Sequence, residues 1–221
     1  TSFMTDYGSV ATAAAAAEET LRQLTQRHAI VAIGSSIEID GGAVRNCARV
    51  FDCGQLRGSY RKIHLFSPHA EHRYHTVGGE PLVVDTSAGR IGVLICYDIR
   101  FPELSRYYFH KGAEIIAVPG QWPEARSQHW RTLLRARAIE NEVFVVGCNR
   151  IGQEKSLKND DVLAFPGDGR IIDPTGEVLA AGNGGSGVLV AELQLRTVRT
   201  MRRMLPVERD QRPSVYRRLW D

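Results

Sequence analysis

Apolar and polar positions along this chain follow two different periods, which is typical of a protein that combines helices with strands. Apolar residues at helical spacing predict helices over 12–27, 103–111 and 127–141. Continuous or alternating apolar runs predict strands over 30–39, 48–53, 59–65, 81–86, 90–97, 114–118 and 143–148. Short glycine-containing stretches between them, such as Gly41-Gly42, predict turns.

The last third of the chain has a weaker pattern. A polar stretch predicts a loop over 152–161, and hairpin-like strands are expected around 171–172, 178–179 and 188–193. The strand–helix–strand order in the middle favours parallel pairing, and the hairpins at both ends favour antiparallel edges. We therefore expect a single α/β domain with mixed sheets over 1–221, in which 196–221 form a C-terminal tail.

Composition narrows the class of protein. Of the 221 residues, 43% are hydrophobic and 24% are charged, as in ordinary globular proteins. No apolar run approaches the ~20 residues that span a bilayer, so we expect no membrane contact. The four cysteines form no Cys-x-x-Cys pair, and no histidines have the spacing of zinc ligands. We therefore expect no metal, no cofactor and a reduced, cytoplasmic protein.

Positive charge is concentrated at the C-terminal end. Residues 196–221 carry eight arginines against three acids, a net charge of +5, whereas the rest of the chain has a net charge of −2. A basic tail can bind nucleic acid. Here the arginines are interleaved with apolar residues, including Met201, Leu205, Tyr216 and Trp220. That mixture favours a segment packed on a neighbouring protein surface, so we expect no nucleic-acid partner.

The strongest candidate for chemistry is a thiol. An apolar run ends at Cys96, a short polar turn follows, and a helix is predicted after Pro102. Cys96 therefore lies at the carboxyl end of a predicted buried strand, where the active sites of open α/β sheets lie. A helix start also favours a thiolate, which is the nucleophilic form of cysteine. The alternative is an ordinary core cysteine.

Other candidates lie in loops and at strand ends. Lys62 shares one face of an extended segment with Tyr60 and His64. It is either a solvated residue or a partly buried cation that stabilises a thiolate and an oxyanion. Glu71, a single loop carboxylate, is weak evidence by itself. Trp122 follows a predicted strand closely and is placed to line the mouth of a pocket.

The order of Lys62, Glu71 and Cys96 resembles that in the nitrilase superfamily of carbon–nitrogen hydrolases. The resemblance extends over nearly the whole chain, and its matching stretches lie at residues 60–66, 71–72, 92–103, 135–141 and 167–176. Within the superfamily the chain is most similar to the omega-amidase branch, which hydrolyses the side-chain amide of 2-oxo acid amides such as 2-oxoglutaramate. The residues that carry this closer similarity are Glu71-His72, Trp122-Pro123 and His129-Trp130.

This resemblance implies a four-layer α-β-β-α sandwich and a role for each candidate. Cys96 would attack the carbon of a small carboxylate-bearing amide, form an acyl-enzyme and release ammonia. Lys62 and the backbone N–H of Tyr97 would hold the oxyanion. Glu71 would position Lys62 or a catalytic water.

The resemblance also implies how a substrate and a partner bind. Trp122 and Arg126 would bind the substrate, and an arginine there suits a carboxylate. The same cysteine chemistry serves N-carbamoyl amino acid hydrolases and nitrilases, which remain alternatives. The tail resembles family tails that pack on a second subunit, which implies a homodimer or a higher homo-oligomer.

One part of the family pattern has no counterpart in this sequence. The general base of the family is a glutamate at the end of an early strand, and Ser2-Phe3 match the residues just after it. Glu18 and Glu19 lie in the predicted helix and do not replace it. We therefore expect the sequence to be N-terminally incomplete. Without that base, the alternative is a catalytically inactive partner or scaffold.

Overall fold

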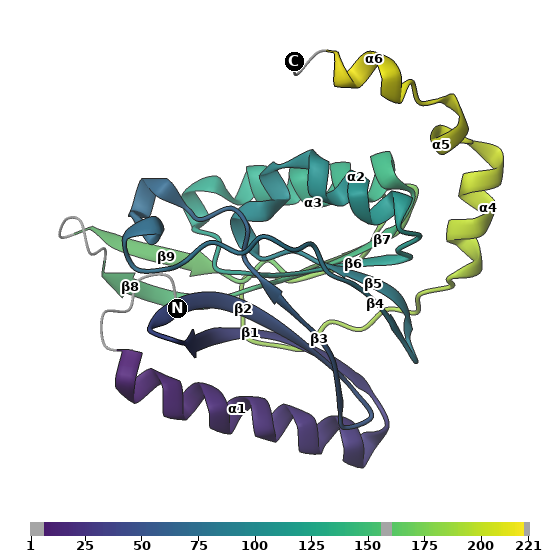
Figure 1. The fold of residues 1–221 in the computed structure, drawn as a ribbon. Helices are drawn as coiled ribbons and strands as arrows, with labels where there is room; N and C mark the ends of the chain where they lie inside the picture. The colour runs from purple at the N-terminus through teal and green to yellow at the C-terminus, as the bar shows by residue number, and fades with distance from the viewer. Residues whose placement is uncertain (1–6, 156–160, 219–221) are drawn as a thin grey trace.

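The computed structural model describes residues 7–155 and 161–218, and these residues form four layers (Figure 1). Helix α1 (Tyr7–His28) lies on one outer side, and helices α2 (Pro102–His110) and α3 (Ser127–Asn141) lie on the other. A three-stranded sheet and a six-stranded sheet lie between these helices. The predicted α/β class, with its α-β-β-α sandwich, is confirmed.

The three-stranded sheet is an antiparallel meander of β1 (Val31–Asp40), β2 (Ala43–Asp52) and β3 (Gln55–Arg61). Gly41 and Gly42 form the first turn, and their positive φ angles of 55° and 80° suit a two-residue hairpin connection. The Thr25 side chain near the end of α1 is buried and accepts a hydrogen bond from Gly54 N–H at 3.1 Å. This bond ties the helix to the turn between β2 and β3.

The six-stranded sheet has the strand order β11-β10-β7-β6-β5-β4. Its strands are β4 (Val83–Thr86), β5 (Gly89–Val93), β6 (Ile115–Gly120), β7 (Phe144–Asn149), β10 (Arg170–Ile172) and β11 (Val178–Ala181). β5, β6 and β7 are parallel, whereas the outer strands pair antiparallel. The carboxyl ends of the three parallel strands therefore meet at one edge, which brings Cys96, Gln121 and Asn149 into one region.

Alternate residues of β6 enter two different cores, because successive side chains of a strand point to opposite faces. Ile115 and Ala117 pack between the two sheets. Ile116 and Val118 pack between the six-stranded sheet and the helices, in the core that also holds the fully buried Trp130. The strand is covered on both faces, and its sequence is therefore a continuous apolar run.

Two predictions for the last third of the chain are wrong. The beginning of the predicted polar loop forms β8 (Ile151–Lys155), which pairs with β9 (Val162–Pro166); residues 156–160 of that loop lie outside the described residues. The predicted strand 188–193 pairs with no other strand in the described part of the chain, and Val188 and Val190 are 89% and 81% exposed. An alternating pattern predicts an extended backbone, but a strand also needs an edge to pair with.

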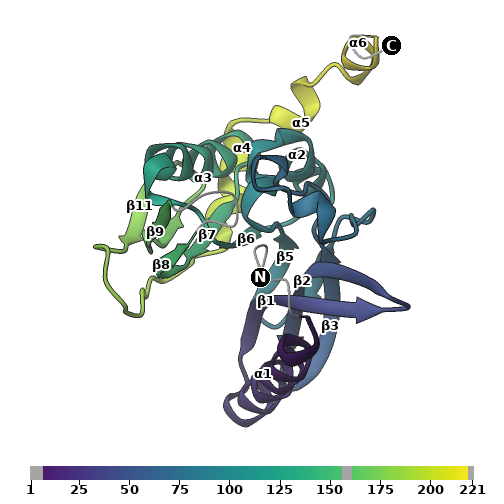
Figure 2. The same ribbon diagram turned by 90° about the vertical axis from the view of Figure 1, so that its left-hand side faces the viewer.

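The C-terminal tail consists of α4 (Arg196–Met204), α5 (Val207–Asp210) and α6 (Pro213–Arg217). α4 packs on the sandwich, since Val198 is buried and Arg202 Nη2 donates to the Ala113 carbonyl at 2.7 Å. α5 and α6 extend away from both sheets (Figure 2). Met204 and Leu205, at the start of this extension, are exposed. The tail therefore presents apolar side chains outside the body of the chain.

Candidate active site

The geometry at Cys96 follows from the way β5 ends. The strand stops at Val93, two buried residues follow, and Cys96 begins a 3₁₀ turn (Cys96–Arg100) that leads into α2. Cys96 has a φ angle of 49°, a conformation that costs a non-glycine residue about 1–3 kcal/mol. The strand predicted over 90–97 therefore ends four residues earlier than expected, at Val93. A strained turn holds the thiol beyond the sheet.

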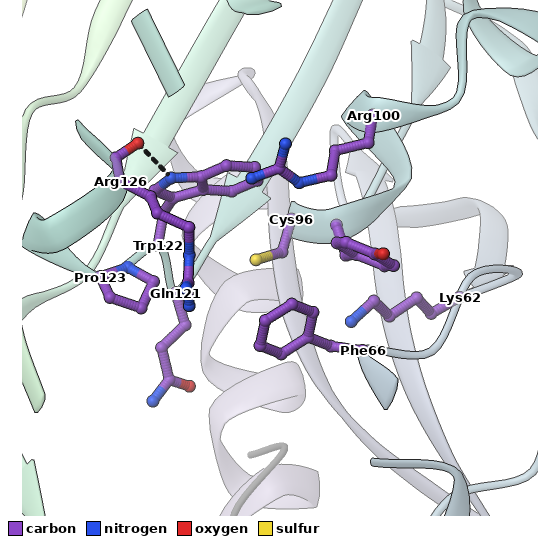
Figure 3. Close-up of a pocket in the computed structure, with 9 residues that line it drawn as sticks. Lys62, Phe66, Cys96, Arg100, Gln121, Trp122, Pro123 and Arg126 are labelled. Carbon is purple, nitrogen blue, oxygen red and sulfur yellow. Dashed lines mark hydrogen bonds between the residues drawn. The ribbon is translucent and has the colours of Figure 1, made fainter. Parts of the chain in front are cut away.

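Cys96 opens into a small cleft that is partly open to solvent. The described residues that line it are Lys62, Phe66, Cys96, Tyr97, Arg100, Gln121, Trp122, Pro123 and Arg126. Figure 3 shows the Cys96 sulfur directed into the space between Trp122, Phe66 and the Lys62 ammonium. Of the six predicted site residues, all except Glu71 line this cleft.

Glu71 lies behind the cleft, where it binds Lys62. Glu71 Oε2 lies 2.6 Å from Lys62 Nζ and accepts Phe66 N–H at 2.6 Å, and Oε1 accepts Asn46 Nδ2 at 3.1 Å. The Lys62 and Glu71 side chains are 3% and 0% exposed. Burial raises the pKa of Glu71, but the Lys62 charge and these hydrogen bonds outweigh it and hold that pKa below its usual value. Lys62 is thus an oriented, buried cation, and the alternative of a solvated lysine is wrong.

The surroundings of the thiol act on its pKa in opposite directions. Burial raises the pKa of Cys96 above its usual value of 9.0, whereas the Lys62 charge and a hydrogen bond from the Gln121 backbone lower it. The negative charges of Glu71 and Asp98 raise the pKa again, so that the net shift is upward. Burial is the largest of these effects on the pKa of Cys96. The thiol stays protonated at neutral pH unless a base removes its proton.

Aromatic rings and guanidinium groups form much of the cleft wall. The Arg100 guanidinium lies 4.7 Å from the centroid of the Trp122 ring, and that of Arg126 lies 5.6 Å from the centroid of Phe66. The Tyr97 ring packs edge-on against Phe66 at 4.9 Å. The described lining residues include three cationic side chains, Lys62, Arg100 and Arg126, and no acidic side chain. The cleft is electrostatically suited to an anionic ligand.

Hydrogen bonds to the end of β7 fix Trp122. Its backbone N–H donates to Asn149 Oδ1 at 2.7 Å, and its carbonyl accepts Asn149 Nδ2 at 3.0 Å. The indole Nε1 donates to the Arg126 carbonyl at 2.7 Å (Figure 3). Phe66, Arg100 and Asn149 were not predicted as site residues. The sequence contains signals that could have found them. Phe66 lies four residues after Lys62, and Arg100 lies four residues after Cys96. Asn149 is the polar residue that ends an apolar strand.

Two kinds of feature are absent from residues 7–155 and 161–218. No group of three or more histidine, cysteine, aspartate or glutamate side chains is placed to hold a metal ion. No helix in these ranges is long and apolar enough to cross a membrane.

Known proteins are similar to this chain in sequence and in fold. The family model described as carbon-nitrogen hydrolase matches residues 3–203. The 2-oxoglutaramate amidase of Bacillus subtilis (strain 168) is 36% identical over 202 residues, which are 90% of this chain and 76% of that protein. The omega-amidase YafV of Escherichia coli (strain K12) is 33% identical over 186 residues, which are 84% of this chain and 70% of that protein.

A solved structure agrees with these sequence relationships. The carbon-nitrogen hydrolase from Helicobacter pylori G27 has a TM-score of 0.90 and 28% identity, and the match covers 98% of this chain and 80% of that one. This chain belongs to the carbon-nitrogen hydrolase family. The predicted family, its omega-amidase branch and the predicted enzyme class are confirmed.

Proposed function

We propose that this protein hydrolyses the carbon–nitrogen bond of a small carboxylate-bearing amide and releases ammonia. The observation that carries the proposal is that the Cys96 thiol and the buried Lys62 ammonium line the same cleft. The Bacillus subtilis relative is named for 2-oxoglutaramate, which is an amide of this class. An omega-amide of a 2-oxo acid is the substrate that we propose first.

In the proposed reaction a general base, which the described lining residues do not supply, takes the Cys96 proton, and the sulfur attacks the amide carbon. The carbonyl oxygen gains the negative charge, which the Lys62 ammonium and the Tyr97 N–H stabilise. The C–N bond then breaks, the nitrogen takes a proton and leaves as ammonia, and a thioester remains on Cys96. Water attacks the thioester carbon, so that the carboxylate product leaves and the thiol is restored. Glu71 holds Lys62 in place through both steps.

Arg126 is the residue that we propose for the substrate carboxylate. Its guanidinium is a planar double donor that matches a carboxylate, and its backbone carbonyl is bonded to the indole of Trp122. Since no acidic side chain is among the described lining residues, a carboxylate entering the cleft meets cations without a competing anion. Trp122 supplies an apolar surface for the carbon chain of the substrate.

Ammonia release from a panel of small compounds tests the proposal. The panel contains 2-oxoglutaramate, a neutral amide of similar length, an N-carbamoyl amino acid and a nitrile. We expect ammonia from 2-oxoglutaramate with the wild-type protein and none with Cys96→Ser. Cys148→Ser is the matched control, because it changes an exposed free thiol outside the cleft, and it should keep the wild-type rate.

The panel also separates the alternatives. Ammonia from the N-carbamoyl compound or the nitrile alone would assign the chain to one of the other branches. No ammonia from any amide would refute the proposal.

A catalytically inactive partner or scaffold is the second candidate function. One observation favours it: none of the described lining residues carries a carboxylate or an imidazole that could take the thiol proton. This candidate requires a folded protein that releases no ammonia from the whole panel. A measurable, Cys96-dependent turnover excludes it.

We also propose that the chain self-associates through its tail. α5 and α6 extend away from the sandwich (Figure 2). The side chains of Val215 and Tyr216 on α6 are exposed. A homodimer or higher homo-oligomer would cover these side chains. Light scattering should give a mass of at least two chains, and a monomer at all concentrations would contradict the proposal.

A cytoplasmic location is proposed from the thiols. All four cysteines are free, and free thiols are typical of a reducing compartment. Cell fractionation should recover the protein in the cytoplasmic fraction, and recovery elsewhere would contradict this.

A further inference from the structure

Asp98 is a buried carboxylate that no step of the proposed reaction uses. It lies two residues after Cys96 and is 0% exposed. Asp98 Oδ2 accepts the N–H of Ile95 at 3.0 Å and the hydroxyl of Tyr60 at 2.9 Å. Oδ1 accepts the N–H of His64 at 2.9 Å and lies 2.9 Å from His64 Nδ1. A carboxylate has about four acceptor positions, so Asp98 is saturated by these contacts.

The partners of this carboxylate belong to the two segments that carry the reacting groups. Tyr60 and His64 flank Lys62, two residues away on either side. Ile95 immediately precedes Cys96, and its bond to the carboxylate closes the 3₁₀ turn. One side chain thus joins the backbone that carries the lysine to the turn that carries the thiol.

We propose that Asp98 is a positioning residue, which sets the place of the Lys62 ammonium relative to the Cys96 sulfur through its bonds to Tyr60 and His64. The inference rests on the roles proposed above for Lys62 and Cys96. Glu71 binds the ammonium itself, whereas Asp98 aligns the segment from which the lysine side chain starts. A displacement of about 1 Å in such a site can lower a rate by ~10²-fold.

The charge of Asp98 and its positioning role have opposite consequences for the thiol. Burial is the main cause of the raised pKa of Cys96, and the negative charge of Asp98 adds to that rise. If Asp98 acted through its charge alone, Asp98→Asn would make the thiol more acidic and faster to react. If Asp98 positions Lys62, the same variant loses the stabilisation of the thiolate and reacts more slowly.

Alkylation of Cys96 by iodoacetamide in the full chain distinguishes these two consequences. The reaction is followed against pH by mass spectrometry of the peptide that contains Cys96, and kcat and KM are measured with the amide that gives ammonia. For Asp98→Asn we expect ~10-fold slower alkylation at about pH 8, and kcat lowered ~10- to 100-fold with KM nearly unchanged. In a Lys62→Met background, Asp98→Asn should no longer slow alkylation, because no ammonium remains to be positioned.

A pair of tyrosine variants gives a matched comparison. Tyr60→Phe removes one hydrogen bond to Asp98 and leaves the Asp98 charge unchanged. We expect alkylation of Cys96 to slow by ~3-fold, the effect of a small displacement of the Lys62 ammonium. Tyr108→Phe also removes a buried hydroxyl, but this one donates to the Val93 carbonyl at 2.6 Å and not to Asp98. It should react at the wild-type rate.

Clear outcomes would overturn the proposal. They are alkylation of Asp98→Asn at or above the wild-type rate, further slowing by Asp98→Asn in the Lys62→Met background, or equal slowing by the two tyrosine variants. If Asp98→Asn does not fold, the tyrosine pair decides. If the wild-type protein releases no ammonia from any amide, the proposed function fails, and alkylation still tests whether Asp98 aligns the lysine with the thiol.

Discussion

Glu71→Gln tests whether the buried ion pair holds the lysine for chemistry. Glu71 Oε2 lies 2.6 Å from Lys62 Nζ and 2.6 Å from Phe66 N, and neither charged side chain is more than 3% exposed. The variant leaves the ammonium buried without its counter-charge, a change that typically lowers the free energy of unfolding by about 3–5 kcal/mol. A neutral amide also orients the ammonium less firmly. We expect kcat to fall by ~10²-fold, as when one oxyanion donor is lost.

The double variant Lys62→Met/Glu71→Gln is the control for this prediction. Because uncharged residues often replace a buried pair at little cost in stability, the double variant should regain most of the stability that Glu71→Gln loses. Its activity should stay low, since the ammonium is absent. Urea unfolding followed by tryptophan fluorescence measures the free energy, and ammonia release measures kcat. Wild-type stability and activity in Glu71→Gln, or recovered activity in the double variant, would refute the reasoning.

Three further predictions concern acid stability, substrate charge and the thiol. Burial alone would raise the pKa of Glu71, but Lys62 holds it below 4.5, so its contribution to stability is present above about pH 4.5 and is lost as the pH falls through the lower folded value. Urea titrations should show this loss in the wild type and not in Glu71→Gln; identical acid profiles would contradict it. Arg126→Ala should raise KM for a carboxylate-bearing amide by ~10-fold or more, the loss of a charged hydrogen bond, and leave a neutral amide unaffected; equal effects on both would exclude the carboxylate contact. Because burial raises the pKa of Cys96 above 9.0, its alkylation should have a midpoint above pH 9, and Lys62→Met should move it higher; a midpoint below 9 would show that burial is not dominant.

The placement of Cys96 could be predicted because its signals are local. An apolar run, a polar turn and Pro102 lie within a dozen residues, and together they specify a strand end beside a helix start. Only the backbone detail differs, since β5 ends at Val93 and the last predicted strand residues form the 3₁₀ turn. That turn depends on Asp98, which also binds Tyr60 in β3 and His64 just after β3, and the role of this residue was not foreseen.

The environment of Lys62 needed information that no local pattern contains. Alternation in the segment places Tyr60, Lys62 and His64 on one face, but it does not reveal whether another layer covers that face. The structure brings Glu71 onto Lys62 from a separate loop, at a distance of 2.6 Å. Only the resemblance to a known family indicated that these residues act together.

The wrong loop prediction at 152–161 and the wrong strand prediction at 188–193 have one physical cause. β8 contains Gln153, Glu154 and Lys155 and pairs with one partner in a two-stranded ribbon, so it lacks an apolar face that would mark it as a strand. The stretch 188–193 has an alternating apolar pattern but no ladder partner among the described residues. Periodicity reports which side chains are apolar, whereas strand formation depends on which backbone edges meet.

Rapid-quench mass spectrometry of Cys96 during turnover tests the central claim most directly. If the thiol and the buried ammonium carry out amide hydrolysis, the peptide that contains Cys96 should gain the mass of the substrate less ammonia, and Lys62→Met should abolish this adduct. Ammonia released while Cys96 stays unmodified, or released by Cys96→Ser at the wild-type rate, would contradict the claim.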